Sequence, residues 1–140
     1  MTVALLAVLV GLALPNYRDL IKNNCMTTNA NNLVSSLQLA RNEAIKRRQN
    51  VSINATGGNW GAGFQVRDAG NNLLREVNLG CAATTITETG AQSAVVYRAT
   101  GFVVSPATFT ICDDRDAETG RQIAVSSTGR PSMDSKLACT

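Results

Sequence analysis

Histidine is absent from this 140-residue chain, and aromatic residues make up only 4% of it. Histidine is the commonest general base and metal ligand, so its absence excludes every Ser-His-Asp or Cys-His nucleophile arrangement. With so few aromatics, the core must consist mainly of Val, Ile, Leu and Ala, and its few large side chains are Trp60, Phe64, Phe102 and Phe109. We predict that the protein is not an enzyme.

Strong charge is also lacking. The formal net charge of +3 is too small to predict a nucleic-acid partner by itself. The chain has no internal repeat, no low-complexity tract and no linker that could separate two domains. A length of 140 residues fits a single domain, so we expect one globular unit.

Cysteine pairs of the C-x-x-C type are missing. The four cysteines, Cys25, Cys81, Cys112 and Cys139, are widely spaced, which argues against a zinc site or a thioredoxin-like redox centre. An even number in a small domain with an apolar N-terminal segment instead predicts disulfides formed in an oxidising compartment. Four cysteines permit three pairings, and the sequence alone selects none of them. We expect no metal and no cofactor.

An aliphatic run is the most distinctive feature present, and it covers residues 3–14. As a helix rising ~1.5 Å per residue it is about 18 Å long, shorter than the ~30 Å hydrocarbon layer of a bilayer. A signal peptide is the alternative, but no basic residue precedes the run and no small-x-small site follows it. Residues 16–22 continue as helix. We therefore divide the chain into a hydrophobic membrane or filament-core segment, residues 1–23, and a globular domain, residues 24–140.

The next part of the chain predicts an amphipathic helix after a weak point. Residues 23–32 contain several Asn and Thr, which bond their own backbone and favour a bend. Helical spacing then predicts an apolar stripe that packs on the domain. The stripe consists of Leu33, Leu37, Ala40 and Ala44, widened by Val34 and Ile45.

After Gln49 the hydrophobic period changes to two, which indicates β-strands. Residues 61–67 and 73–79 flank a turn at residues 68–71 and predict a hairpin. Further strands are expected at residues 51–53, 94–98, 102–104, 109–112 and 122–126. A long N-terminal helix packed on an antiparallel β-sheet domain is an α+β fold.

This order of elements resembles the type IV pilin-like proteins. The segments at residues 37–47, 60–66, 111–113 and 127–130 are similar to those of the GspH/FimT family of minor pilins and pseudopilins, and the likeness covers essentially the whole chain. Members normally begin with a leader and a glutamate ahead of the apolar stretch. Residues 1–4 correspond to the interior of that helix, so we expect an N-terminally incomplete segment.

The resemblance implies a structural subunit of a type IV pilus that takes part in filament assembly or priming. Its expected partners are other pilins, bound through the N-terminal helix, and the bacterial inner membrane before assembly. The domain would then be periplasmic, and later part of the filament or its tip. The alternative is the corresponding minor pseudopilin of a type II secretion system. A carboxylate hydrolase that uses Asp113 and Glu118 is a third hypothesis, disfavoured because both acids lie in one short loop.

Some members of this family bind DNA through a Gly-Arg-x-Arg motif near the C-terminus. This chain keeps the first arginine, Arg130, and lacks the second. Double-stranded DNA is therefore a candidate partner through Arg121, Arg130 and Lys136, with weak, salt-sensitive binding. The alternative is a solvated tail without a ligand.

For the cysteines we favour Cys112 with Cys139, joining the last strand region to the C-terminus, and Cys25 with Cys81, joining the helix to the sheet. Asp113, Asp114, Asp116 and Glu118 resemble a calcium loop, but Gly120 comes one position late for an EF-hand, so we expect a solvated turn. Trp60 is expected to be a core anchor.

Overall fold

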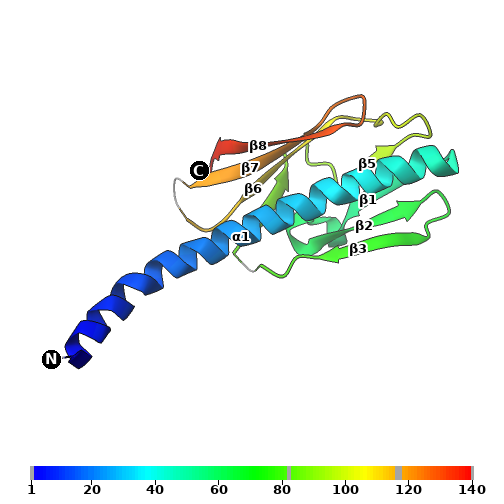
Figure 1. The fold of residues 1–140 in the computed structure, drawn as a ribbon. Coiled ribbons are helices and arrows are strands. Elements are labelled where there is room, and N and C mark those ends of the chain that lie inside the picture. Colours follow the sequence, from blue (N-terminus) through cyan, green and yellow to red (C-terminus); the bar gives the residue numbers. More distant parts are fainter. Residues whose placement is uncertain (1, 82, 116–117, 140) are drawn as a thin grey trace.

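The computed structural model describes residues 2–81, 83–115 and 118–139. One helix, α1 (Thr2–Arg47), precedes two four-stranded antiparallel sheets. The C-terminal half of α1 lies along the body formed by the sheets, whereas its N-terminal half extends well beyond that body (Figure 1). This is the predicted α+β architecture.

The first sheet has the strand order β3-β2-β1-β5. Its strands are β1 (Val51–Ala55), β2 (Gly63–Asp68), β3 (Leu73–Asn78) and β5 (Ala94–Tyr97). The predicted hairpin is confirmed, since β2 pairs with β3 from Gly63 opposite Asn78 to Arg67 opposite Leu73. Asp68 fixes the turn because one carboxylate oxygen accepts hydrogen bonds from the N–H groups of Gly70 and Asn72, each at 2.9 Å.

The second sheet has the order β4-β6-β7-β8. It is formed by β4 (Thr85–Glu88), β6 (Ala107–Cys112), β7 (Thr119–Val125) and β8 (Pro131–Ala138). Two short 3-10 helices, η1 (Thr56–Gly58) and η2 (Trp60–Ala62), lie between β1 and β2. β4 and β8 were not predicted from the sequence, because the side chains of both strands are mostly polar and lack a clear apolar alternation.

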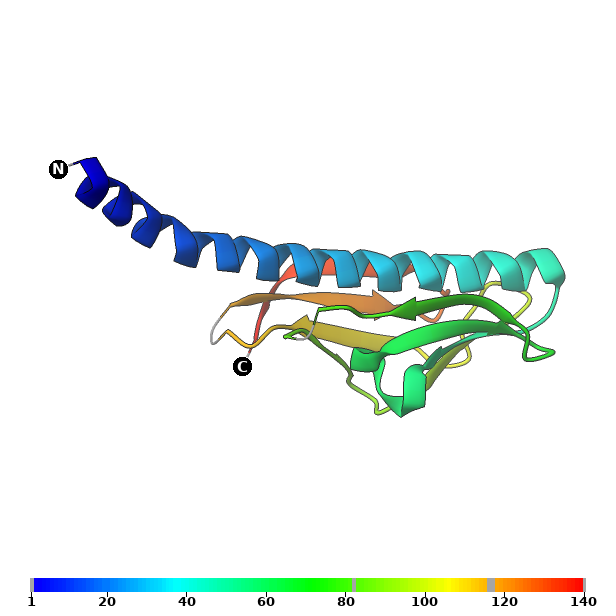
Figure 2. The same cartoon turned by 90° about the horizontal axis from the view of Figure 1, so that it is seen from below.

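The predicted bend at residues 23–32 is wrong, because α1 continues through this segment. Met26 and Ala30 are fully buried and Asn29 nearly so. Burial against the sheets stabilises the helix here more than its weak propensity disfavours it. The helix also continues through Pro15 and curves in its N-terminal part, shown in blue in Figure 2.

The core lies between α1 and the inner faces of the sheets. The predicted stripe of Leu33, Leu37, Ala40 and Ala44 is fully buried. Ile45 and Phe102, which we expected in the core, lie at the other end of the body. They are 46% and 49% exposed, so both expectations are wrong. The predicted strand at residues 102–104 is also absent, and a single bridge between Tyr97 and Val103 takes its place.

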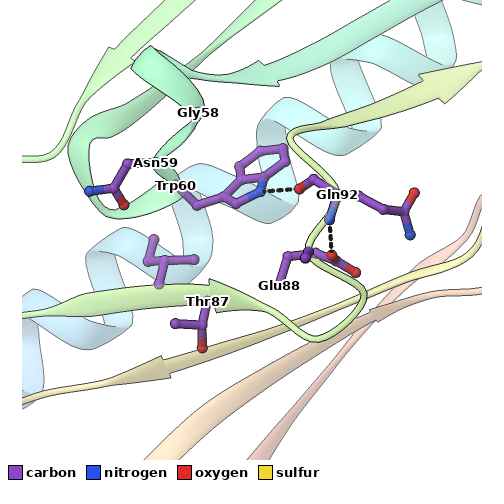
Figure 3. Close-up of a pocket in the computed structure, with 8 residues that line it drawn as sticks. Gly58, Asn59, Trp60, Thr87, Glu88 and Gln92 are labelled. Carbon is purple, nitrogen blue, oxygen red and sulfur yellow. Dashed lines mark hydrogen bonds between the residues drawn. The ribbon is translucent and has the colours of Figure 1, made fainter.

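Trp60 is a core anchor, as expected. It is 4% exposed, and its ring meets that of Phe109 edge to face with centroids 4.8 Å apart. The indole N–H donates to the backbone carbonyl of Gln92 at 2.8 Å, so its one polar group is satisfied. Trp60 also lines a depression of about 290 Å³, together with Thr87 and Glu88 (Figure 3).

Candidate assembly surface and helix collar

The N-terminal half of α1, residues 3–21, protrudes from the body (Figure 1). Several apolar side chains of this protruding half are exposed to solvent. The exposed apolar residues occupy successive positions along the helix, so the apolar surface surrounds the helix and is not a single stripe. The exposed fractions are 78% for Val3, 61% for Leu6, 62% for Val8, 60% for Leu9 and 55% for Val10. Such a surface is unfavourable in water and requires cover by lipid or by other helices.

Among the residues that the structure describes, no helix is both long enough and apolar enough to cross a membrane.

A collar joins α1 to the second sheet at the point where the helix leaves the body. We define it as residues 19–25 of α1 together with Cys81 and residues 112–115 and 118. The ammonium group of Lys22 lies 2.7 Å from a carboxylate oxygen of Asp114. Arg115 donates to the side-chain oxygen of Asn23 at 2.7 Å and lies 3.6 Å from the carboxylate of Asp19. The loop after β6 therefore holds the helix through charged contacts.

Asp113 orients Arg115 within the collar. Its carboxylate accepts hydrogen bonds from the backbone N–H of Arg115 at 3.0 Å and from Nε at 2.8 Å. Burial raises the pKa of Asp113, but the hydrogen bonds and positive charge of Arg115 outweigh this and leave the pKa below its ordinary value. The same contact raises the pKa of Arg115. Both groups are thus charged at neutral pH, and Arg115 is fixed in its direction towards the helix.

Two disulfides border the collar. Cys25 of α1 is bonded to Cys81, with Cα atoms 5.9 Å apart, and Cys112 is bonded to Cys139, with Cα atoms 5.8 Å apart. Both are the pairings that we favoured from the sequence. The first joins the helix to the segment between the sheets, and the second joins the end of β6 to the residue after β8. Covalent and charged links therefore meet where the helix begins to protrude.

The acidic loop differs from the solvated turn expected from the sequence. Asp113 faces inward to Arg115, and Asp114 contacts the helix through Lys22. Asp116 lies outside the described residues. Within the described part of the chain, no group of three Asp, Glu, Cys or His side chains is placed to hold a metal ion. The spacing that resembled a calcium loop instead produces a contact with α1.

The candidate DNA-binding residues do not form one cluster. Arg121 lies near the start of β7, opposite Ile111, and donates to the carbonyl oxygens of Thr119 and Gly120. Arg130 lies in the turn at the opposite end of the β7–β8 hairpin, where Val125 pairs with Pro131. The side chain of Lys136 lies outside the described residues, although its backbone belongs to β8. Residues 131–138 form the edge strand β8, in which residues 132–135 are exposed to solvent.

Arg130 has a neighbour that the sequence did not indicate. It lines a mainly polar cleft of about 320 Å³ together with Gln38, Arg41, Asn42 and Pro131. Arg41 is fixed there because its Nε donates to the carbonyl oxygen of Gly101 at 3.2 Å. Two arginines about 90 positions apart in the sequence therefore line one cleft, which only the packing of α1 on the hairpin reveals.

Solved structures with the same architecture define the class of protein as type IV pilin-like. The minor pilin FimU of Pseudomonas aeruginosa PAO1 is 29% identical and has a TM-score of 0.74, and the alignment covers 84% of this chain and 95% of that one. A second crystal form of FimU gives 28% identity and a TM-score of 0.69, with coverages of 81% and 96%. The minor pseudopilin EpsH of Vibrio cholerae, at 13% identity and a TM-score of 0.62, has the same fold, with coverages of 78% and 95%.

Residues 29–129 match the model of the family described as Type II transport protein GspH, and the chain belongs to that family. No curated protein sequence matches it. The resemblance expected from the sequence is confirmed at the level of family and fold. The family and the fold are those of structural pilins and pseudopilins.

Proposed function

We propose that this protein is a minor pilin, a structural subunit of a type IV pilus that takes part in filament assembly or priming. The observation that carries the proposal is the contrast within α1 between a buried half and an uncovered apolar half. Helices with this surface pack together by close apolar contact. Residues 1–23 would be the segment that enters a filament core, and residues 24–140 the body that remains outside it.

The partners follow from the same surface. Other pilins would cover the apolar half of α1 in the filament, and the bacterial inner membrane would receive it before assembly. The body would then be periplasmic, in agreement with its two disulfides, which form in oxidising compartments. After assembly the protein would be part of the filament or its tip.

A minor pseudopilin of a type II secretion system is the alternative function. The 29% identity to a minor pilin, against 13% to a minor pseudopilin, favours the pilus. Deleting the gene in the source bacterium distinguishes the two. We expect fewer surface pili, counted by electron microscopy, with unchanged secretion of folded proteins. Normal piliation with lost secretion would identify a pseudopilin.

The assembly surface is tested with Leu6→Arg, which places a charge on the protruding half. Thr28→Arg is the control, since Thr28 is an exposed position on the docked half of the same helix. A charged side chain within packed apolar helices is costly, by about 2.5–3.5 kcal/mol on insertion scales. We expect Leu6→Arg to reduce incorporation into sheared filaments at least tenfold, as measured by immunoblot, and Thr28→Arg to incorporate normally. Equal incorporation of both variants would contradict the proposal.

Duplex DNA is a second proposed partner. The proposal is supported by the position of Arg130 and Arg41, which line the same cleft. Gel-shift titrations of the protein at two salt concentrations test it. We expect Arg130→Ala to weaken binding and flatten its salt dependence, because one phosphate contact is lost. Arg121→Ala should have the smaller effect, since Arg121 donates to its own strand. Binding unchanged by Arg130→Ala would remove the cleft from this proposal.

A further inference from the structure

An apolar patch with one arginine lies on the outer face of the first sheet, at the end of the body far from the protruding helix. Residues 102–104 run antiparallel to β5, since Val104 N donates to Val96 O at 2.9 Å and Arg98 N to Phe102 O at 2.8 Å. Tyr97 and Val103 pair and are buried, so alternation places their neighbours on the outer face. We call these neighbours the distal patch, and they are Val96, Arg98, Phe102 and Val104.

The distal patch is strongly exposed for apolar side chains, with Phe102 at 49% and Val104 at 50%. Val96 also borders a depression of about 350 Å³, which has room for a side chain of a partner. The chain has only three Phe residues, and one of them is exposed here next to two valines. Burying this side chain in the core would have stabilised the fold. Exposed apolar groups of this kind mark interaction sites.

The segment that carries Phe102 is held rigidly. Gly101 and Gly129 both have positive φ, 82° and 81°, and a Cβ on Gly129 would lie only 2.1 Å from the carbonyl oxygen of Gly101. Arg41 donates to the same oxygen at 3.2 Å. Two turns and the helix therefore pack closely and fix the segment, so the patch loses little conformational entropy on binding.

Charge is distributed unevenly between this end and the rest of the molecule. The distal end, comprising residues 41–50, 67–72, 98–104 and 126–130, contains seven cations and two carboxylates, a formal charge of +5. The remaining six cations and eight carboxylates give −2, in agreement with the net charge of +3. Both distal carboxylates are engaged by Arg47, with Glu43 at 2.6 Å and Asp68 at 3.3 Å. The end of the molecule that carries the patch is therefore positively charged and complements an acidic partner.

We propose that the distal patch docks an acidic protein surface, namely that of another subunit of the same filament. A carboxylate of that subunit pairs with Arg98, and its apolar side chains cover Phe102 and Val104. Aromatic and arginine anchors of this kind dominate interface energies. Protein is favoured over nucleic acid because the neighbours of Phe102 are aliphatic valines, whereas bases stack on aromatic platforms. The inference rests on the proposed function, since a filament supplies the partner.

Site-specific photo-crosslinking tests the patch in the source bacterium. A photoreactive phenylalanine analogue replaces Phe102 in the full chain, and the matched control replaces Leu73, which is 48% exposed at the opposite edge of the same sheet. We expect position 102 to crosslink to one filament subunit at least fivefold more than position 73. The crosslinked peptide, identified by mass spectrometry, should contain Asp or Glu.

Reversing the charge of Arg98, and then that of its partner, is the second part of the test. Arg98→Glu should reduce the crosslink from position 102 at least fivefold, and changing the partner's carboxylate to Lys should restore it. Equal yields at 102 and 73, a partner peptide without a carboxylate, failed restoration, or a crosslinked species that nuclease removes would each overturn the inference. The filament fraction separates the two proposals. If the chain is present there without these crosslinks, only the distal patch fails; if the chain is absent, the proposed function and the inference fail together.

Discussion

The two halves of α1 use the same aliphatic residue types for opposite purposes. In residues 25–47, Leu33 and Leu37 are fully buried on the sheets of their own chain. In residues 3–21, Leu6 and Leu9 remain about 60% exposed. The difference lies in the spacing of the polar residues, because the docked half has one apolar stripe whereas the protruding half has no polar face along residues 3–14.

This comparison shows that burial is divided along one continuous helix. The docked half stabilises the domain, whereas the protruding half makes few contacts with its own chain and, under the proposed function, is available for assembly. The collar marks the boundary between them, through the Cys25–Cys81 disulfide and the contacts of Lys22 and Arg115.

The largest difference in stability should appear when a leucine is changed to alanine in each half of α1. Leu37→Ala removes a fully buried side chain, and we expect it to lower the free energy of unfolding by about 2–5 kcal/mol through lost burial and a cavity. Leu6→Ala should change it by less than about 0.5 kcal/mol, since an exposed side chain stabilises little. Urea unfolding followed by circular dichroism measures both. Similar losses would show that the protruding half also contributes to the fold.

Breaking the covalent link at the collar should have the next largest effect. We expect Cys25→Ser with Cys81→Ser to lower the free energy of unfolding by about 2–4 kcal/mol. Cys112→Ser with Cys139→Ser is the comparison. Because the first disulfide spans 56 residues and the second 27, the first should contribute about 0.6 kcal/mol more. Urea titrations of both double variants test this order, and the reverse order would contradict the loop-length explanation.

The smallest and most local effect is expected for Arg115→Ala. It removes the contacts to Asn23 and Asp19, so backbone amides of residues 19–24 should exchange hydrogen several-fold faster, as measured by mass spectrometry. Arg18→Ala is the control on the same helix, at a position without the collar contacts described above. Unchanged exchange in residues 19–24 would show that Arg115 does not hold the helix.

Acid should loosen the same collar. The lowered pKa of Asp113 means that its stabilising contribution is complete above the unfolded value of about 3.9 and is lost as the pH falls through the folded pKa. We therefore expect faster exchange at residues 19–24 only below about pH 4, after correction for the intrinsic pH dependence of exchange. Loosening near neutral pH would point to another group.

Local patterns predicted most of the fold. The buried stripe of α1 and the β2–β3 hairpin follow from helical spacing and from the Asp68 turn, both encoded by neighbouring residues. The predictions that failed concern residues whose environment is distant in sequence. The expected bend at residues 23–32 is absent because Met26 and Ala30 are buried, and β8 forms because β7 supplies its hydrogen bonds.

The surfaces for which we propose functions divide in the same way. The apolar run and the family resemblance indicated an assembly helix from sequence alone. The cleft shared by Arg41 and Arg130, the exposure of Phe102 and the role of the acidic loop as a helix contact were not predictable. Each of these features depends on contacts between side chains that lie far apart in the sequence.

The sequence by itself determined that a long helix would precede antiparallel strands, because backbone propensity and the period of apolar residues are local properties. It also determined that part of this helix would lack a polar face. Only the tertiary structure decided where the helix leaves the body and which charges face one another. Those features arise from packing between distant segments, whose free energy no local pattern contains.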